Sequence, residues 1–315
     1  MIAGEQLQRV PGCENGEPPY SQELIGGGRV NRSYLVRTRL GRYVVRLNDN
    51  SDSDPGHDPE GELGLHTAAA AAGIAPPVLY AAADGSSLIT EYLDGRLWTP
   101  HYFSRMRDLR SLGQRLRSLH AITPPAVARF NPMGAARQYA DLILRAEPEE
   151  GERIRMLLDK GAAALANSGH DRRGATIVHG DLHHGNVLTA DRVYFIDWEY
   201  AQVGDPMLDL ACILSYYPRS APHGALLLEA SGLADAGATP GMLAELTSVF
   251  TLINYLWYRA RRVFRAVPAT DLQVESSALP RLLMLAPETQ PRHTSAANSR
   301  GFSGVGKSDG DIAGD

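Results

Sequence analysis

The sequence predicts an α+β protein of two lobes, with an antiparallel β-sheet in the N-terminal lobe and mostly helices in the C-terminal lobe. Short runs that alternate apolar and polar residues, separated by turn residues, fill residues 20–93, as expected of strands joined by hairpins. Further along the chain, apolar residues recur three or four positions apart, as expected of helices with one buried face. We therefore expect an N-terminal extension at 1–19, an N-terminal lobe at 20–93 and a helical C-terminal lobe at 94–286.

The N-terminal lobe is expected to contain five strands and one helix. Turn residues separate the strands, namely the triplet Gly26-Gly27-Gly28, the run Leu40-Gly41-Arg42 and the pair Asp84-Gly85. A proline at the first helical position and a glycine after the last place the helix at Pro59–Ala72. The expected strands are Tyr20–Ile25, Ser33–Arg39, Tyr43–Leu47, Pro76–Tyr80 and Ser87–Tyr92.

The C-terminal lobe is expected to be built from helices around one catalytic segment. Its first helix has a stripe of leucines at the helical spacing, Leu109, Leu112, Leu116 and Leu119. The other expected helices are 135–147, 149–166, 205–217, 223–231 and 240–265. The last segment, 287–315, is rich in Ser, Gly, Asp and Thr and has almost no large apolar residues, so we expect a disordered tail there.

Composition and charge exclude several classes of protein. At 315 residues and 43% hydrophobic, the chain can bury a large core. The net charge of −5 lacks the basic surplus that nucleic acids and anionic membranes require of a partner. Two cysteines indicate a reducing compartment and no disulfide framework. We expect no secretory signal, no membrane-spanning helix and a cytoplasmic monomer or homodimer.

The segment between residues 177 and 199 holds the residue types that phosphoryl transfer needs. Asp181 is followed closely by Asn186 and, after a short apolar run, by Asp197. In such sites one carboxylate accepts the proton of a hydroxyl, while an amide and a second carboxylate hold Mg²⁺ against nucleotide phosphates. Val193–Ile196 is typical of a hairpin strand that would bring Asp197 beside the loop. The pattern predicts Asp181 as the catalytic base, and Asn186 and Asp197 as Mg²⁺ ligands, with ATP as the phosphoryl donor.

The same segment resembles the aminoglycoside phosphotransferase and choline kinase superfamily, whose members share the protein-kinase-like fold. The resemblance extends to Trp198-Glu199 and to the run Gly204-Asp205-Pro206-Met207-Leu208-Asp209-Leu210-Ala211. Residues 196–200, Ile-Asp-Trp-Glu-Tyr, are most similar to bacterial choline/ethanolamine and thiamine kinases. Over roughly residues 20–265, the resemblance implies an ATP-dependent kinase that phosphorylates a hydroxyl of a small molecule.

The resemblance, together with local pattern, indicates which N-lobe residues contact ATP. Glycines let backbone N–H groups approach phosphates, so Gly26, Gly27 and Gly28 are expected to cover them. Arg46 stands where protein kinases have a phosphate-binding lysine, although it could equally be a solvent-facing arginine. Glu62 is the expected partner of Arg46, although the helix dipole alone explains a first-turn glutamate. The other ATP-binding candidates follow the glycines or lie at the expected hinge: Asn31, Ser33, Glu91 and Leu93.

Three histidines lie in or beside the catalytic loop. A zinc site built from His179, His183 and His184 would have to exclude Asp181 and Asn186 from the same loop. We therefore expect His179 to orient the loop through hydrogen bonds, and His183 or His184 to line the acceptor pocket.

The acceptor-binding residues are defined least by the sequence. A quaternary ammonium such as choline is best held by aromatic faces and a carboxylate. Tyr200 matches a pocket tyrosine of choline kinases, whereas Tyr216 stands where choline and thiamine kinases carry a glutamate. Trp257 could supply a further aromatic face or pack in a helix core. The substrate-binding candidates are His183, His184, Tyr200, Tyr216 and Trp257.

Three functions compete. The first is a metabolic kinase of the choline, ethanolamine or thiamine type, and the second is an aminoglycoside kinase, for which the acids of the C-terminal lobe are scattered rather than clustered. The third is a nucleotide-binding pseudokinase, which the presence of Asp181, Asn186 and Asp197 argues against. We expect the first.

Overall fold

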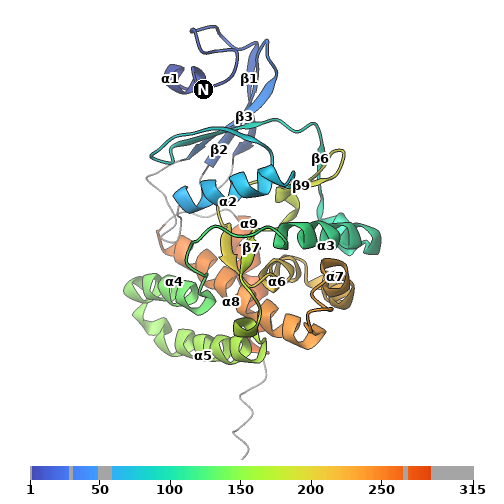
Figure 1. Ribbon diagram of the computed structural model, residues 1–315. Helices are drawn as coiled ribbons and strands as arrows, with labels where there is room; N and C mark the ends of the chain where they lie inside the picture. The colour runs from blue at the N-terminus through green and yellow to red at the C-terminus, as the bar shows by residue number, and fades with distance from the viewer. Residues whose placement is uncertain (1, 28–30, 49–58, 265–268, 285–315) are drawn as a thin grey trace, which may run out of the picture. The chain divides into compact units, whose positions relative to one another are not determined.

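The computed structural model describes residues 2–27, 31–48, 59–264 and 269–284. All of these belong to one compact unit, Met1–Leu285. Gly28 and the tail expected at 287–315 lie outside the described residues. Figure 1 shows a β-sheet at the top of the molecule and helices below it, which confirms the α+β fold with a sheet-containing N-terminal lobe and a helical C-terminal lobe.

The N-terminal lobe contains a five-stranded sheet of order β1-β2-β3-β5-β4. Every neighbouring pair of strands is antiparallel. Within this sheet Arg46 is paired with Ser33 on one side and with Leu88 on the other. The strands are β1 (Ser21–Gly27), β2 (Asn31–Arg37), β3 (Arg42–Asn48), β4 (Val78–Ala81) and β5 (Ser87–Glu91).

The first strand ends later than the sequence predicted. Gly26 and Gly27 were expected in the turn, but they continue β1 opposite Ser33 and Arg32, past a bulge that follows Leu24. Glycine, which lacks a Cβ atom, is often found where a strand contains a bulge.

The N-terminal extension packs on the sheet. It contains the short helix α1 (Gly4–Leu7), and its residues Ile2, Val10 and Cys13 are buried in a small core with Tyr43 and Val45 of β3. The extension therefore covers one part of the N-terminal lobe.

Helix α2 (Pro59–Ala71) connects the sheet to the C-terminal lobe. Leu65 and Ala69 belong to the same buried cluster as the helices below. Gly73, with φ of +67°, turns the chain after the helix, and the carbonyl of Ile74 accepts a 2.9 Å hydrogen bond from the N–H of Phe195.

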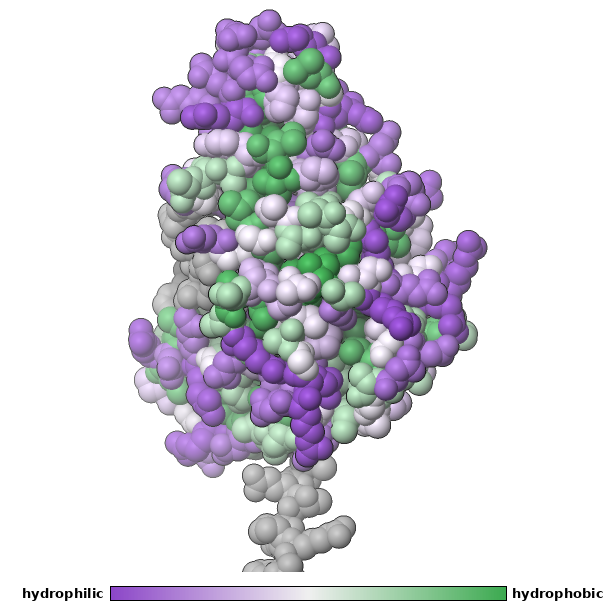
Figure 2. All heavy atoms as spheres, in the orientation of Figure 1, coloured by the Kyte–Doolittle hydropathy of each residue, from purple (hydrophilic) through white to green (hydrophobic). Residues whose placement is uncertain are grey.

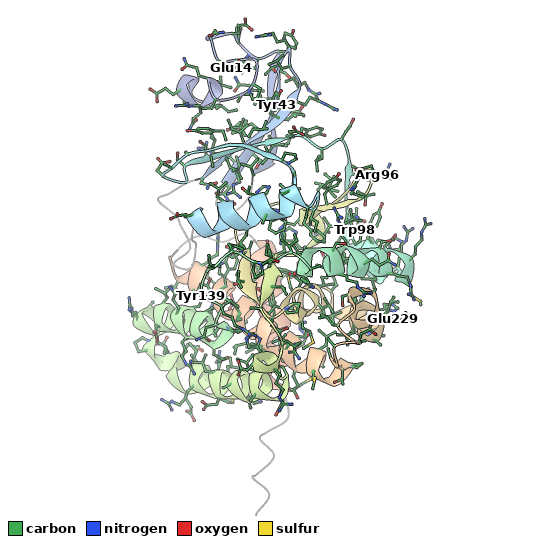
Figure 3. The ribbon with its side chains drawn as sticks, in the orientation of Figure 1. Glu14, Tyr43, Arg96, Trp98, Tyr139 and Glu229 are labelled. Atoms are coloured by element: carbon green, nitrogen blue, oxygen red, sulfur yellow. The ribbon has the colours of Figure 1, made fainter. Side chains whose placement is uncertain are left out.

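The chain enters the C-terminal lobe through β6 (Arg96–Leu97), which pairs with β8 (Val187–Thr189). Trp98 follows β6, and its Nε1–H donates a 2.8 Å hydrogen bond to Oγ1 of Thr189. Figure 3 shows Arg96 and Trp98 on the segment that joins the sheet to the first long helix of this lobe. The connection between the lobes is thereby fixed to the β8 hairpin.

The C-terminal lobe is a set of helices around α8, which packs against α4, α5, α6 and α9. The predicted leucine stripe is fully buried in α3, and the other predicted helices differ from the observed ones only at their ends. Helix α9 was not predicted. The helices are α3 (Met106–His120), α4 (Pro132–Ala146), α5 (Gly151–Asn167), α6 (Met207–Tyr216), α7 (Gly224–Ser231), α8 (Pro240–Phe264) and α9 (Ala269–Leu283).

Short elements complete the lobe and hold the catalytic segment. Strand β7 (Thr176–Val178) pairs with β10 (Gln202–Gly204), and β8 pairs with β9 (Val193–Phe195). The 3₁₀ turns are η2 (Pro100–Ser104), η3 (Pro148–Glu150), η4 (His170–Arg172), η5 (His184–Asn186) and η6 (Pro218–His223).

The outer surface in Figure 2 is mostly hydrophilic over the N-terminal end of the molecule and over the lower helices, and hydrophobic side chains gather in the middle. None of the helices in the described part of the chain is both long enough and apolar enough to cross a membrane.

Candidate active site

The catalytic loop, residues 179–186, follows β7 and is oriented by His179. The Nε2–H of His179 donates to the carbonyl of Ile196 at 3.1 Å, and its Nδ1 accepts the N–H of Asp181 at 3.3 Å. Burial lowers the pKa of His179, so the ring is neutral, as an accepting Nδ1 requires. These contacts are those expected of a residue that orients the loop.

Asp209 of α6 fixes the backbone of the same loop. Its buried carboxylate accepts the N–H of His179 at 3.3 Å and that of Gly180 at 3.0 Å, and Nε2 of His120 lies 2.9 Å from it. Gly180 has φ of +76°, and a Cβ atom there would lie 2.5 Å from the carbonyl oxygen of Tyr200. A side chain at this position would therefore displace the loop.

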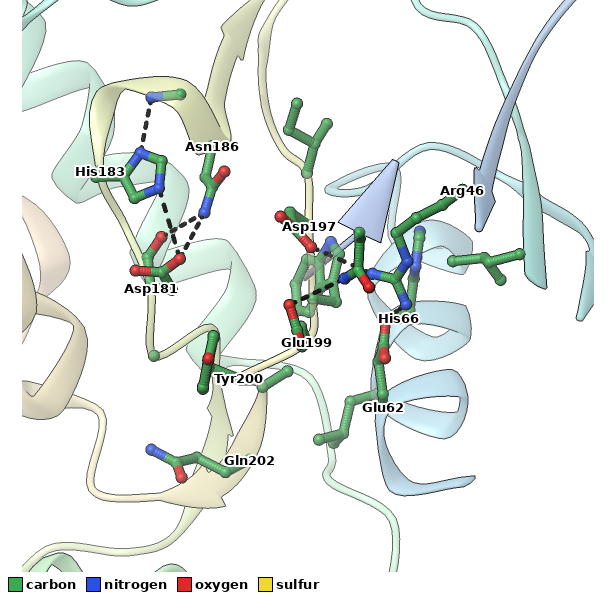
Figure 4. Close-up of a pocket in the computed structure, with 18 of the residues that line it drawn as sticks. Arg46, Glu62, His66, Asp181, His183, Asn186, Asp197, Glu199, Tyr200 and Gln202 are labelled. Carbon is green, nitrogen blue, oxygen red and sulfur yellow. Dashed lines mark hydrogen bonds and ion pairs between the residues drawn. The ribbon is translucent and has the colours of Figure 1, made fainter. Parts of the chain in front are cut away.

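The carboxylate of Asp181 faces the cavity with both oxygens in hydrogen bonds. Nδ2 of Asn186 donates to Oδ2 at 2.9 Å, and the hydroxyl of Tyr216 donates to Oδ1 at 2.7 Å. Nε2 of His183 lies 3.6 Å from Oδ2 (Figure 4). Burial and the charge of Asp181 raise the pKa of Tyr216 well above its usual value, so this phenol stays a donor. The carboxylate of Asp181 is thus held in one orientation, and the amide oxygen of Asn186 is not used in its bonds to Asp181.

Asp197 lies at the end of the β8–β9 hairpin, as predicted. The N–H of Ile196 donates to the carbonyl of Asn186 at 3.0 Å, which brings the end of β9 against the catalytic loop. Asp197 has φ of 62°, in the left-handed region that residues other than glycine seldom adopt. Its side chain is 44% exposed and lies between Asp181 and Arg46 in Figure 4. Backbone strain of this kind is often found at functional sites.

Arg46 of β3 reaches the site from the sheet. It is 8% exposed, donates to Glu62 of α2 and lies 3.2 Å from Oδ1 of Asp197. Burial alone would lower the pKa of Arg46, but the charges of Glu62 and Asp197 raise it above its ordinary value. Its buried Nε–H has no acceptor among the described residues. A phosphate oxygen would supply one.

The indole of Trp198 connects the catalytic loop to α2. It is fully buried, with ring centroids 4.8 Å from His179 and 5.8 Å from His66. His66 follows Glu62 by one helical turn, and its Nε2–H donates to the carbonyl of Pro76 at 3.0 Å. Burial lowers the pKa of His66 to about 4, so it is neutral at pH 7.

Glu199 is a site residue that the sequence analysis missed. Its carboxylate accepts a 3.1 Å hydrogen bond from Nδ2 of Asn31. Burial, together with the charge of Asp197, raises the pKa of Glu199 to about 8. Its place in the run Asp197-Trp198-Glu199, directly beside the predicted metal ligand, was the available signal.

One cavity of about 1460 Å³ is lined by most of these groups, whereas His120, His179 and Asp209 are not part of its lining. His184 is a correction to the predicted set, because its exposed ring is not in the lining and its Nδ1 lies 2.8 Å from the hydroxyl of Tyr217. The predicted residues in the described lining are Asn31, Ser33, Arg46, Glu62, Glu91, Leu93, Asp181, His183, Asn186, Asp197, Tyr200, Tyr216 and Trp257.

The oxygen ligands in this cavity fit a magnesium ion that binds with a nucleotide. Mg²⁺ prefers oxygen and is usually held by one or two carboxylates together with substrate phosphates and water. Asn186, Asp197 and Glu199 offer such oxygens around the predicted position. Across the described ranges, no three His, Cys, Asp or Glu side chains cluster closely enough to hold a metal by themselves.

The fold and this cavity define a phosphotransferase with the protein-kinase-like fold. A family model described as "Phosphotransferase enzyme family" matches residues 21–246, and the chain belongs to that family. This agrees with the resemblance to aminoglycoside phosphotransferases and choline kinases stated from the motifs.

Solved structures with similar folds include kinases of several kinds. A choline/ethanolamine kinase family protein from Mesorhizobium loti is 19% identical, with a TM-score of 0.68 over 90% of this chain and 92% of that one. Choline kinase LicA from Streptococcus pneumoniae is also 19% identical, with a TM-score of 0.72 over 86% and 96%. A spectinomycin phosphotransferase is 14% identical, with a TM-score of 0.54 over 85% and 90%. At these identities the likeness establishes the fold.

Proposed function

We propose that this protein transfers the γ-phosphoryl group of ATP to a hydroxyl of a small molecule in the presence of Mg²⁺. The observation that supports this most strongly is the convergence of Asp181, Asn186 and Asp197 in one cavity, opposite the Arg46–Glu62 pair. Solved relatives with AMP and with ADP bound support a nucleotide as the donor.

In the proposed reaction Asp181 accepts or orients the proton of the acceptor hydroxyl, which attacks the γ-phosphorus in line. Tyr216 and Asn186 hold the carboxylate of Asp181 in place. Arg46 neutralises phosphate charge, and its unpaired Nε–H supplies a donor for a phosphate oxygen. Mg²⁺, when bound, neutralises charge on the phosphates, and Asn186 and Asp197 are the residues that would hold it, with Glu199 beside them.

The adenine and the phosphates are assigned to the N-terminal lobe and the hinge. Glu91 and Leu93 line the cavity where β5 ends, at the position proposed for the adenine edge. Asn31 and Ser33 line it near the end of the glycine segment, which is proposed to cover the phosphates through Gly26, Gly27 and Gly28.

An amino alcohol of the choline, ethanolamine or thiamine type is the first acceptor class to test. The choline and choline/ethanolamine kinases with similar folds support it, as does the aromatic residue Tyr200 in the lining. An aminoglycoside is the alternative, supported by the spectinomycin phosphotransferase. The requirement for ATP supports a cytoplasmic location, and a monomer or a homodimer is compatible with the proposal.

ATP consumption should be measured with choline, ethanolamine, thiamine, aminosugars and aminoglycosides, with and without Mg²⁺. We expect turnover that depends on both an acceptor and Mg²⁺ and that is lost in Asp181→Asn. Tight binding of Mg²⁺ and ATP without turnover of any acceptor would instead support the pseudokinase alternative.

A further inference from the structure

Part of the C-lobe side of the cavity is formed by one face of α4 and one face of α8. In both helices the lining residues recur three or four positions apart, as one helical face requires. They are Gly134, Ala135, Gln138 and Tyr139 of α4, and Phe250, Ile253, Asn254, Trp257, Tyr258 and Arg261 of α8. Figure 3 shows Tyr139 on α4, below the sheet.

The acidic side chains of the described cavity lining all lie outside α4 and α8. The carboxylates in the described lining are Glu62, Glu91, Asp181, Asp197 and Glu199, and none of them belongs to α4 or α8. On those two helical faces, Arg261 is the one lining residue in the described ranges that carries a full charge at pH 7.

Arg261 differs from its neighbours on α8. Arg259 pairs with Glu147, and Arg262 lies 3.2 Å from Glu275, so both are neutralised by carboxylates. No ion pair joins Arg261 to another described residue, and its buried Nε–H has no hydrogen-bond acceptor there. A buried donor without an acceptor is costly, and a ligand that supplies one recovers this cost.

The guanidinium of Arg261 is oriented by Trp257. Its Cζ lies 4.6 Å from the centroid of the indole ring. When a guanidinium stacks on an aromatic face, its N–H groups point outward in its own plane and can bind a carboxylate or phosphate through two oxygens.

A row of aromatic residues connects Arg261 to the base. The ring of Trp257 lies 4.8 Å from that of Tyr258, and both line the cavity together with Tyr216. Tyr216 in turn donates to Asp181. An acceptor that follows this row would present its hydroxyl at one end and its far group at the other.

We propose that Arg261 binds an anionic group, a carboxylate or a phosphate ester, on an alcohol whose hydroxyl is phosphorylated at Asp181. This inference rests on the proposed function and names the chemical class of its acceptor. A quaternary ammonium stacked on Trp257 would meet the positive charge of Arg261, so the same geometry disfavours choline at that ring.

The test uses matched acceptors that differ only in the far group. Linear ω-hydroxy acids of increasing length are compared with ω-hydroxyalkyl phosphates, diols and amino alcohols of the same lengths, by Mg²⁺-dependent ATP consumption. We expect the anionic compounds of one length range to have kcat/KM about 10-fold or more above the diol and the amino alcohol. The carboxylate and phosphate series identify which anion the site prefers.

The variants Arg261→Met and Arg262→Met separate recognition from stability. Arg261→Met keeps the apolar stem and should raise KM for the anionic acceptor about 10- to 150-fold, because a hydrogen-bonded charge is lost. KM for ATP should stay unchanged. Arg262→Met, on the same helix but outside the cavity lining, should change neither constant, and Arg261→Lys should recover part of the affinity.

The outcomes distinguish this inference from the proposed function. Turnover of diols or amino alcohols at least as efficient as that of the anionic series would overturn the anionic acceptor and leave the kinase intact. An anionic preference that survives in Arg261→Met would also overturn it. If no acceptor supports Mg²⁺-dependent ATP consumption, the proposed function fails and this inference fails with it.

Discussion

The hydroxyl of Tyr216 donates a 2.7 Å hydrogen bond to Oδ1 of Asp181. The motif resemblance implies that choline and thiamine kinases carry a glutamate at the position that Tyr216 occupies. A second carboxylate there would repel Asp181, whereas the phenol stabilises its charge and keeps it oriented. The same substitution removes an anion from the C-lobe side of the cavity. A tyrosine in place of a glutamate at position 216 therefore affects both the orientation of Asp181 and the charge of the cavity wall that the acceptor contacts.

Replacing Tyr216 by Phe should lower kcat about 3- to 30-fold, because the orientation of Asp181 loses a hydrogen bond to a charged group. KM for ATP should stay within error, since Tyr216 belongs to the C-lobe side of the cavity. Steady-state kinetics of wild type and variant measure both. Tyr217→Phe is the matched control, because the phenol of Tyr217 bonds to His184 instead of Asp181. An equal loss in both variants would mean that the effect is structural.

Replacing Asp181 by Asn should reduce turnover by about 10²- to 10⁴-fold, the usual range for loss of a general base. Asn keeps the size of the side chain and can still accept from Tyr216, so binding of ATP should persist. Single-turnover kinetics and ATP titration test the two parts separately. Asp191→Asn, in the exposed turn before β9, is the control. A nearly fully active Asp181→Asn enzyme would place the base elsewhere.

Replacing Asp197 by Asn should weaken Mg²⁺-dependent binding of ATP strongly and leave the fold intact. Asn tolerates the left-handed backbone found at this residue, so the change removes charge without adding strain. Titration of Mg²⁺ at fixed ATP measures the effect, and the melting temperature checks the fold. Undiminished Mg²⁺ affinity would show that Asp197 is not a ligand.

Much of the fold followed from local pattern. The apolar runs of β2 and β3, the leucine stripe of α3 and the proline at the start of α2 are all visible in the sequence itself. The relation of Asp181 to Asn186 was equally accessible, because both lie on one short loop.

What sequence reasoning missed depends on contacts between distant segments. Arg261 lies on a face of α8 whose apolar periodicity predicts burial in the core. Only the packing of α8 against α4 shows that this face lines a cavity. His183 and His184 are adjacent, so the backbone of the loop decides which one faces the cavity. Helix α9 was missed, and it contains Pro280, a residue that usually ends a helix in sequence-based interpretation.

Acidification should destabilise the protein partly through His66. Its pKa is about 4 in the folded protein against 6.5 in a model peptide, so the unfolded chain binds a proton that the folded one does not. The contribution of His66 to the free energy of unfolding is complete above pH 6.5 and decreases as the pH falls toward 4. At pH 5 it is lower by about 2 kcal/mol. Urea denaturation at pH 7 and pH 5 measures the change.

His66→Gln removes the titrating ring but keeps a donor for the carbonyl of Pro76. The free energy of unfolding of this variant should therefore decrease less between pH 7 and pH 5 than that of wild type, by about 2 kcal/mol. Buried His179, whose pKa is also lowered, remains in the variant and accounts for a further part of the loss. An identical decrease in wild type and His66→Gln would show that His66 takes up a proton without cost in the folded state.

Replacing Asp209 by Ala should destabilise the C-terminal lobe and slow catalysis together. The N–H groups of His179 and Gly180 would lose their acceptor in a buried place, and His120 would lose its partner. Removing one member of such a buried charged group costs about 3–5 kcal/mol, which urea denaturation resolves easily. Asp235→Ala, at an exposed position, should stay within about 0.5 kcal/mol of wild type.

The double variant with His120→Ala shows how the cost at Asp209 is divided. If the histidine contact matters, His120→Ala and Asp209→Ala should together cost less than the sum of the two single changes, by about 0.5–3 kcal/mol. Full additivity would mean that Asp209 acts only through the two backbone N–H groups. Asp209→Ala with wild-type stability and turnover would contradict the anchoring of the catalytic loop by this carboxylate.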